Sequence, residues 1–250
     1  MDKKHPLIRL VRLTFSLFSA AALAGGLWMT FTGRPPASSW ILAGLTALIA
    51  FLLTYVPDYL SYRDIMMVPA SLQLAFILFI FLAMFLGNLL NFYQRFPWWD
   101  TMLHFASGAL FSLAGLSLLV SMIREPDLIR QINPRVFFLF SFVFSLACGA
   151  VWEIFEFTAD SFLGMNMQRW QSDLTPLQWE ALILVSNRSS PGLIDTMTDL
   201  IAGGLGALLA SLLVLPSIRR VSSYPGVDLT ARQLEDRLRS QGDNDEKAGE

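Results

Sequence analysis

The stretch TMLHFASGALFSLAGLSLLVSM, residues 101–122, contains no Lys, Arg, Asp or Glu. A membrane-spanning helix needs about 20 consecutive, mostly apolar residues, and this stretch is long enough. Five further apolar runs complete a set of six expected spans, at residues 13–31, 40–55, 70–90, 101–122, 136–160 and 195–215. Helices satisfy their own backbone hydrogen bonds in hydrocarbon, and the period-two alternation of a membrane barrel is absent. The sequence therefore predicts an all-α, polytopic membrane protein with six transmembrane helices.

The composition agrees with a membrane protein. The chain is 54% hydrophobic and 15% charged, whereas soluble domains have about 25% charged residues. A net charge of −2 gives no general basic surface for nucleic acid. The single cysteine, Cys148, excludes an internal disulfide. We therefore expect membrane lipids, and not nucleic acid, as partners.

The basic residues in the loops predict the orientation of the chain. Most of the loop Lys and Arg fall on one side of the expected bundle, and cytoplasmic loops normally carry this excess. Both termini are therefore expected in the cytoplasm. Residues 22–24, Ala-Leu-Ala, resemble a signal-peptide cleavage site, but the apolar run continues to Phe31, so we expect an uncleaved first helix.

The sequence predicts three parts. Residues 1–220 form the membrane domain, with a polar site in its last three helices, at about residues 98–206. Residues 161–193 form an outer loop, and within it an N-cap, a Pro and a Gln at 175–178 predict a short interfacial helix. Residues 221–250 form a polar, partly disordered cytoplasmic tail.

Ionisable residues gather in the last three spans, where no Lys or Arg accompanies them. They are Asp100, His104, Glu153, Glu156, Asp160, Asp195 and Asp199. The expected orientation puts all of them toward the outer ends of their helices. The pairs Asp100/His104 and Asp195/Asp199 are spaced i,i+4, and Glu153/Glu156 are spaced i,i+3. These spacings place the two members of each pair on one helix face. The three faces therefore predict one shared pocket.

Three interpretations of these acids stay open: a divalent metal site, a proton-carrying cluster, or separate interfacial residues. A helix N-terminus stabilises a nearby acid, which would account for Asp100 and Asp195, but Glu153 and Glu156 are near a C-terminus, where negative charge is disfavoured. As a metal site, the candidate ligands are Asp100, His104, Glu153, Glu156 and Asp199. Imidazole and carboxylates suit Mg²⁺, Mn²⁺ or Zn²⁺. Asp195, or Glu156 if it is left uncoordinated, would act as general base.

Small residues on the fourth and sixth spans predict that these two helices pack closely. They are Ser107, Gly108, Ser112 and Gly115 on the fourth, and Ala202, Gly203, Gly204, Gly206 and Ala207 on the sixth. Small side chains let membrane helices approach backbone to backbone. This contact would also position the acids.

Three motifs carry a resemblance to a known family. They are WWDTMLHFASG (98–108), EIFE (153–156), and DTMTD (195–199) followed by GLGA (204–207). In this order they resemble the YjdF-like family of bacterial inner-membrane proteins and, more distantly, the VanZ-like proteins, over about residues 60–215. The resemblance implies a role in the bacterial cell envelope at the outer leaflet. The chain differs from the YjdF-like pattern after GMNMQ (164–168), where an insertion follows.

Three functions are compatible with these features. The first is a metal-dependent hydrolase or transferase that acts on a lipid or lipid-linked envelope substrate, although the sequence has no familiar nucleophile motif. The second is a cation or proton transporter using the same carboxylates, although the acids cluster at one end, whereas a transport path needs polar groups at the midplane. The third is a non-catalytic protein that organises membrane partners.

Overall fold

The computed structural model describes residues 5–123, 129, 132–168 and 191–219. Within these ranges the chain is helical and has no strand. Six helical segments are long and apolar enough to cross a membrane: Pro6–Thr32, Ala37–Tyr62, Ala70–Leu89, Trp99–Met122, Pro134–Leu163 and Pro191–Val214. The predicted all-α fold with six membrane-spanning helices is therefore confirmed. The predicted interfacial helix at 175–185 and the tail at 221–250 lie outside the described residues.

Nine helical elements follow one another along the described residues, and the connection from α8 to α10 is the longest between them. They are α1 (Pro6–Thr32), α2 (Ala37–Leu53), α3 (Val56–Tyr62), α4 (Ala70–Ile80), the π-helical η1 (Phe81–Leu89), α5 (Phe92–Arg95), α6 (Trp99–Met122), α8 (Pro134–Leu163) and α10 (Pro191–Arg219). α1 begins seven residues before the predicted span, since Pro6 occupies its first turn and the His5 side chain accepts a hydrogen bond from the Leu7 amide. The apolar run marks the hydrocarbon part of this helix, whereas the cap marks its end.

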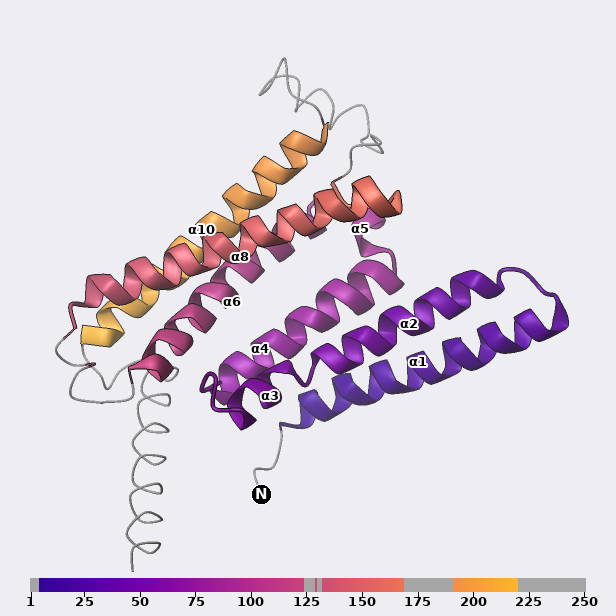
Figure 1. Ribbon diagram of the computed structural model, residues 1–250, viewed down its shortest axis with the longest axis horizontal. Helices are drawn as coiled ribbons and strands as arrows, with labels where there is room; N and C mark the ends of the chain where they lie inside the picture. Colours follow the sequence, from indigo (N-terminus) through magenta and orange to yellow (C-terminus); the bar gives the residue numbers. More distant parts are fainter. Residues whose placement is uncertain (1–4, 124–128, 130–131, 169–190, 220–250) are drawn as a thin grey trace, which may run out of the picture.

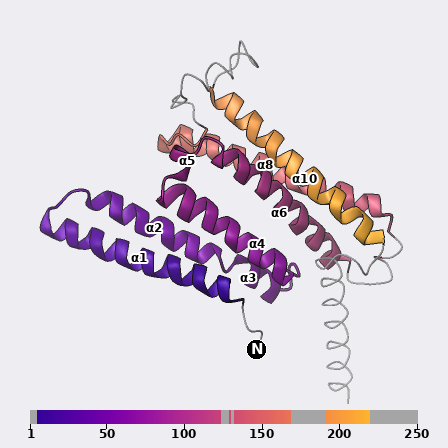
Figure 2. The same cartoon turned by 180° about the vertical axis from the view of Figure 1, so that it is seen from behind.

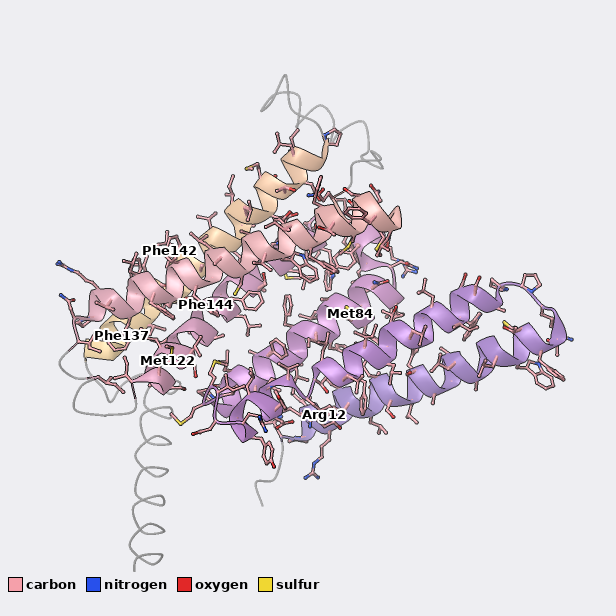
Figure 3. The ribbon with its side chains drawn as sticks, viewed as in Figure 1. Arg12, Met84, Met122, Phe137, Phe142 and Phe144 are labelled. Carbon is pink, nitrogen blue, oxygen red and sulfur yellow. The ribbon has the colours of Figure 1, made fainter. Side chains whose placement is uncertain are left out.

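The bundle consists of two three-span halves (Figures 1 and 2). In the first half α1 packs along α2, α1 contacts α4 and η1, and α2 contacts η1. In the second half α6, α8 and α10 each pack against the other two. Each half has its own apolar core, centred on Phe15 and Ile77 in the first and on Phe137 and Leu116 in the second. Arg12 and Met84 belong to the first half, and Phe137, Phe142 and Phe144, on α8, to the second (Figure 3).

The first half contains a partly buried ion pair. Arg12, near the start of α1, lies 2.6 Å from Asp58 on α3 and also donates to the Thr54 carbonyl at 2.6 Å. The other Asp58 oxygen accepts from the Gln73 amide on α4 at 2.7 Å, and the Tyr55 ring lies 3.9 Å from the guanidinium. The pair therefore ties α1, α3 and α4 together.

The halves meet where α6 contacts the segment that precedes α4. The Ser117 hydroxyl donates to the Met67 carbonyl, and the Ser121 hydroxyl accepts from the Met67 amide at 2.9 Å. α4 also packs along α6. α6 is therefore the element that joins the two halves.

Glycines bring α6 and α10 into backbone contact, as the small residues predict. A Cβ added to Gly108 would overlap the Gly203 carbonyl, and one added to Gly206 would overlap the Phe105 carbonyl. Both positions therefore require glycine for steric reasons. The prediction of close packing between these two helices is confirmed.

Buried serines connect all three helices of the second half. The hydroxyls of Ser112 on α6 and Ser211 on α10 lie 2.8 Å apart, and Ser141 on α8 lies 3.2 Å from Ser211. Ser145 donates to the Gly108 carbonyl at 2.7 Å. Hydrogen bonds of this kind join membrane helices at about 0.6 kcal/mol each. They fix α8 against the α6–α10 pair, and all three carry residues of the site described next.

Candidate metal centre

Three helix ends bring the ionisable residues together. α6 begins, α8 ends and α10 begins at the same end of the bundle, as Figure 1 shows. Asp100 is in the first turn of α6 and His104 is one turn further in. Glu153 lies ten residues before the end of α8 at Leu163, and Asp199 lies in the third turn of α10. The three helices therefore place these ionisable side chains at a similar depth in the bundle.

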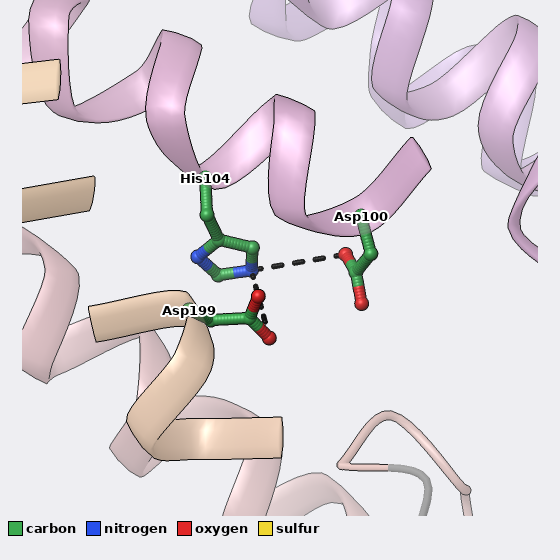
Figure 4. A group of neighbouring side chains, drawn as sticks. All are labelled: Asp100, His104 and Asp199. Carbon is green, nitrogen blue, oxygen red and sulfur yellow. Dashed lines mark ion pairs between the residues drawn. The ribbon is translucent and has the colours of Figure 1, made fainter. Parts of the chain in front are cut away.

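His104 is at the centre of the cluster. Its Nε2 lies 3.7 Å from Asp100 Oδ1 and 3.8 Å from Asp199 Oδ2, as drawn in Figure 4. Its Nδ1 lies 3.8 Å from Glu153 Oε1 on α8. One donor atom from each of Asp100, His104 and Asp199 lies within 4.8 Å of the other two. The imidazole is therefore flanked by carboxylates on both edges.

The remaining predicted acids lie close to this group. Asp199 lies within electrostatic range of Asp100, Asp195, Glu153 and Glu156. Glu156 is buried, and one of its oxygens accepts a hydrogen bond from the Trp152 indole at 2.8 Å. The structure thus gathers the five predicted ligands with Asp195, the predicted general base, into one region.

Asp160 has a different role from the other acids. Its two carboxylate oxygens accept hydrogen bonds from the backbone amides of Met167 and Gln168, at 2.7 and 2.9 Å. It therefore closes the turn after Gly164, whose left-handed φ of 65° ends α8. The Gln168 side chain then donates to Thr196 on α10 at 2.8 Å. Asp160 therefore uses both of its oxygens in the local turn and lies outside the three residue pairs for which a shared pocket is predicted.

Two of the central carboxylates have buried oxygens with no hydrogen bond to the described residues. Asp199 is 2% exposed and its Oδ2 has no hydrogen-bond partner among the described residues. Glu153 is 6% exposed, and the described part of the chain places no hydrogen-bond donor on either of its oxygens. Burying a charged group without a partner costs several kcal/mol. A cation among these oxygens would remove much of that cost.

The spacing of the donors fits a metal ion better than direct hydrogen bonds. Nitrogen and oxygen in a hydrogen bond lie about 2.7–3.2 Å apart, and the separations of 3.7 and 3.8 Å around Nε2 exceed that range. Two ligand atoms about 2.1 Å from a common tetrahedral ion lie roughly 3.4 Å apart. Small side-chain movements would therefore bring Asp100, His104 and Asp199 into a ligand arrangement.

Sequence reasoning missed two polar features. One is the indole of Trp152, which holds Glu156 one helical turn away. The other is the partly buried pair of Arg12 and Asp58. A lone Arg and a lone Asp within apolar helices are a general signal for such a pair. Arg12 was instead interpreted as one of the basic residues that set the orientation.

Comparisons with known proteins identify the chain as a membrane protein. An uncharacterized protein of Thermotoga maritima is 28% identical over 152 residues, an alignment that covers 61% of this chain and 64% of that protein. The chain thus spans less than two thirds of the length of this relative. No solved structure matches. A family model described as "Predicted membrane protein (DUF2238)" matches residues 11–220, and this family is the YjdF-like family that the three motifs indicate. This multi-pass membrane protein therefore belongs to the DUF2238 family.

Proposed function

We propose that Asp100, His104 and Asp199 bind one divalent metal ion, and that the protein uses this ion in hydrolysis or group transfer on a lipid or lipid-linked envelope substrate. One observation carries the metal site. Three donor atoms of two helices lie within 4.8 Å of one another, and one of them, Asp199 Oδ2, is buried without a hydrogen-bond partner among the described residues.

The donor set limits the choice of ion. One imidazole and two carboxylates suit Zn²⁺, Mn²⁺ or Mg²⁺. Three protein ligands leave coordination positions for water or substrate, as in catalytic sites. A divalent ion in this place would polarise a substrate carbonyl or phosphoryl group and acidify water.

Two further acids are candidates for the general base. Asp195 and Glu156 both lie within electrostatic range of the proposed ligands. The Trp152 indole holds one oxygen of Glu156, which fixes the direction of this carboxylate. A general base must be positioned within hydrogen-bond reach of the proton that it removes. We assign the role to Asp195, with Glu156 as the alternative.

The proposal places the site at the outer face of a bacterial inner membrane, with both termini in the cytoplasm. In its support, Arg135 at the start of α8 and Arg219 at the end of α10 lie at the helix ends opposite the site. Basic residues favour the cytoplasmic side. Ile154, Phe155 and Phe157 are exposed on α8 beside Glu153, as expected where a helix faces lipid. A substrate with acyl chains could therefore approach from the membrane. The VanZ-like resemblance would fit such an envelope role.

Metal binding by the purified full-length protein tests the proposal. After treatment with a chelator, we expect the wild type to bind one Mn²⁺ or Zn²⁺ per chain in equilibrium dialysis. Asp199→Asn replaces an anionic carboxylate by a neutral amide and His104→Ala removes the imidazole, and we expect each to weaken binding by about 100-fold. Asp64→Asn, an exposed position in the first half, is the charge-matched control and should bind like the wild type.

The result also distinguishes the other functions. A wild type that binds no more metal than the double variant of His104 and Asp199 refutes the metal site. Proton-coupled or cation flux in vesicles, in the absence of bound metal, would then favour the transporter. If neither is found, a non-catalytic organising role is left.

A further inference from the structure

The two nitrogens of His104 face different partners. Nε2 faces Asp100 and Asp199, at 3.7 and 3.8 Å, whereas Nδ1 faces Glu153 at 3.8 Å. An imidazole binds one ion through one nitrogen, and a metal-bound histidine almost always donates its other N–H to a carboxylate, a carbonyl or a water. The carboxylate of Glu153 is thus on the edge of the ring opposite to the proposed metal.

We infer that Glu153 is a positioning residue that accepts a hydrogen bond from Nδ1–H of His104 and so directs Nε2 toward the metal between Asp100 and Asp199. The inference rests on the proposed metal site and deepens it. It differs from the ligand role that the sequence predicts for Glu153. A carboxylate in this place fixes both the tautomer and the orientation of the ring, and makes the ring a stronger ligand.

The surroundings of Glu153 support this role. Its side chain is 6% exposed with both oxygens buried, and a carboxylate that also interacts with the Thr196 hydroxyl still has an acceptor available for Nδ1–H. Thr196 is its polar neighbour on α10, and the Thr196 hydroxyl accepts from Gln168 at 2.8 Å. A shift of about 1 Å by the ring or the carboxylate would bring the 3.8 Å separation to a normal hydrogen bond.

The backbone holds Glu153 in this place. Ser145, two turns earlier on α8, donates to the Gly108 carbonyl at 2.7 Å, and Gly108 is one turn after His104 on α6. This bond fixes the register between α8 and α6. The carboxylate of Glu153 is therefore directed at His104 by helix packing and not by a loop.

Three variants of the full-length protein, with a fourth as the control, separate a positioning residue from a ligand. The probe is Co²⁺, whose visible absorption reports the atoms bound to the ion. We expect Glu153→Gln to weaken Co²⁺ binding about tenfold and Glu153→Ala up to about 100-fold, both with one ion per chain and with the wild-type band positions. Asp199→Asn should alter the bands or abolish binding, and Asp64→Asn should match the wild type.

Nitrogen NMR of the zinc-loaded wild type gives an independent measurement that does not depend on the folding of a variant. The chain has two histidines, His5 and His104, so assignment is simple. We expect Zn²⁺ on Nε2 of His104 and a proton on Nδ1. Zinc on Nδ1, Co²⁺ bands that move in Glu153→Gln as they do in Asp199→Asn, or unchanged affinity in both Glu153 variants would overturn the inference. A wild type that binds no ion would instead refute the proposed function itself.

Discussion

The glycine contact between α6 and α10 provides a direct test of how the site is held. A Cβ on Gly108 would overlap the Gly203 carbonyl, and the two backbones would have to separate by about 1.5 Å to restore an ordinary contact of 3.4 Å. Neither partner is a side chain, so no rotamer change relieves the overlap. Overpacking of this kind costs about 3 kcal/mol, and the higher helix propensity of Ala returns about 1 kcal/mol. We expect Gly108→Ala to destabilise the protein by about 2 kcal/mol.

The same movement should disturb metal binding. Gly108 is one turn after His104, and Gly203 is one turn after Asp199, so the displacement acts directly on the pair of donors that now lie 3.8 Å apart. Functional groups must be held within about 0.5 Å of the productive geometry. A separation of about 1.5 Å exceeds that tolerance about threefold, and we expect the Mn²⁺ affinity to fall at least about tenfold.

Thermal unfolding followed by circular dichroism, together with Mn²⁺ titration, measures both effects. A loss of about 2 kcal/mol corresponds to a fall of about 4–8 °C in Tm for a chain of this size. Gly149→Ala is the matched control on α8, since its added Cβ would meet Leu200 at an ordinary 3.8 Å. Its Tm and affinity should not fall. A Gly108→Ala protein with wild-type Tm and affinity would refute the reasoning.

Two further predictions concern polar contacts away from the metal ligands. Arg12→Leu leaves the Asp58 carboxylate without its cation, so we expect a loss of about 2–3 kcal/mol in the free energy of unfolding, with part of the loss restored by adding Asp58→Asn; equal stability of the single variant and the wild type would contradict this. Asp160→Ala removes the acceptor for the amides of Met167 and Gln168, and we expect a loss of about 1–2 kcal/mol with faster amide exchange at those two residues. Unchanged exchange at both amides would show that the carboxylate does not hold this turn.

The membrane fold could be predicted from the sequence because each span is a long apolar run, and small residues are a direct signal for close packing. The sequence also predicts that the acids lie toward one end of the bundle, because successive helices run in opposite directions through the membrane. Gly108 and Gly203 thus lie where the pattern of small residues predicts a contact. The apolar runs, the small residues and the positions of the acids can each be recognised from residue spacing within a single helix.

Other features could not be predicted in this way. Spacing shows which residues share a face of α8, but the rotation of α8 against α6 depends on contacts such as the Ser145 hydrogen bond to Gly108. The nitrogen of His104 that faces Glu153 is therefore a result of packing. The partners of Asp160 are backbone amides, which carry no sequence signal, so its role in the turn after α8 could not be predicted.

The anchoring of the donors in rigid helices separates two parts of the protein that can change independently. Asp100, His104, Glu153 and Asp199 are all held by helix-to-helix contacts of the second half. The connection between α8 and α10, which includes residues 169–190, supplies none of these four groups. The donor geometry of the proposed centre therefore depends on helix packing, and we expect a change in the length of residues 169–190 to leave the separation of His104 and Asp199 unchanged.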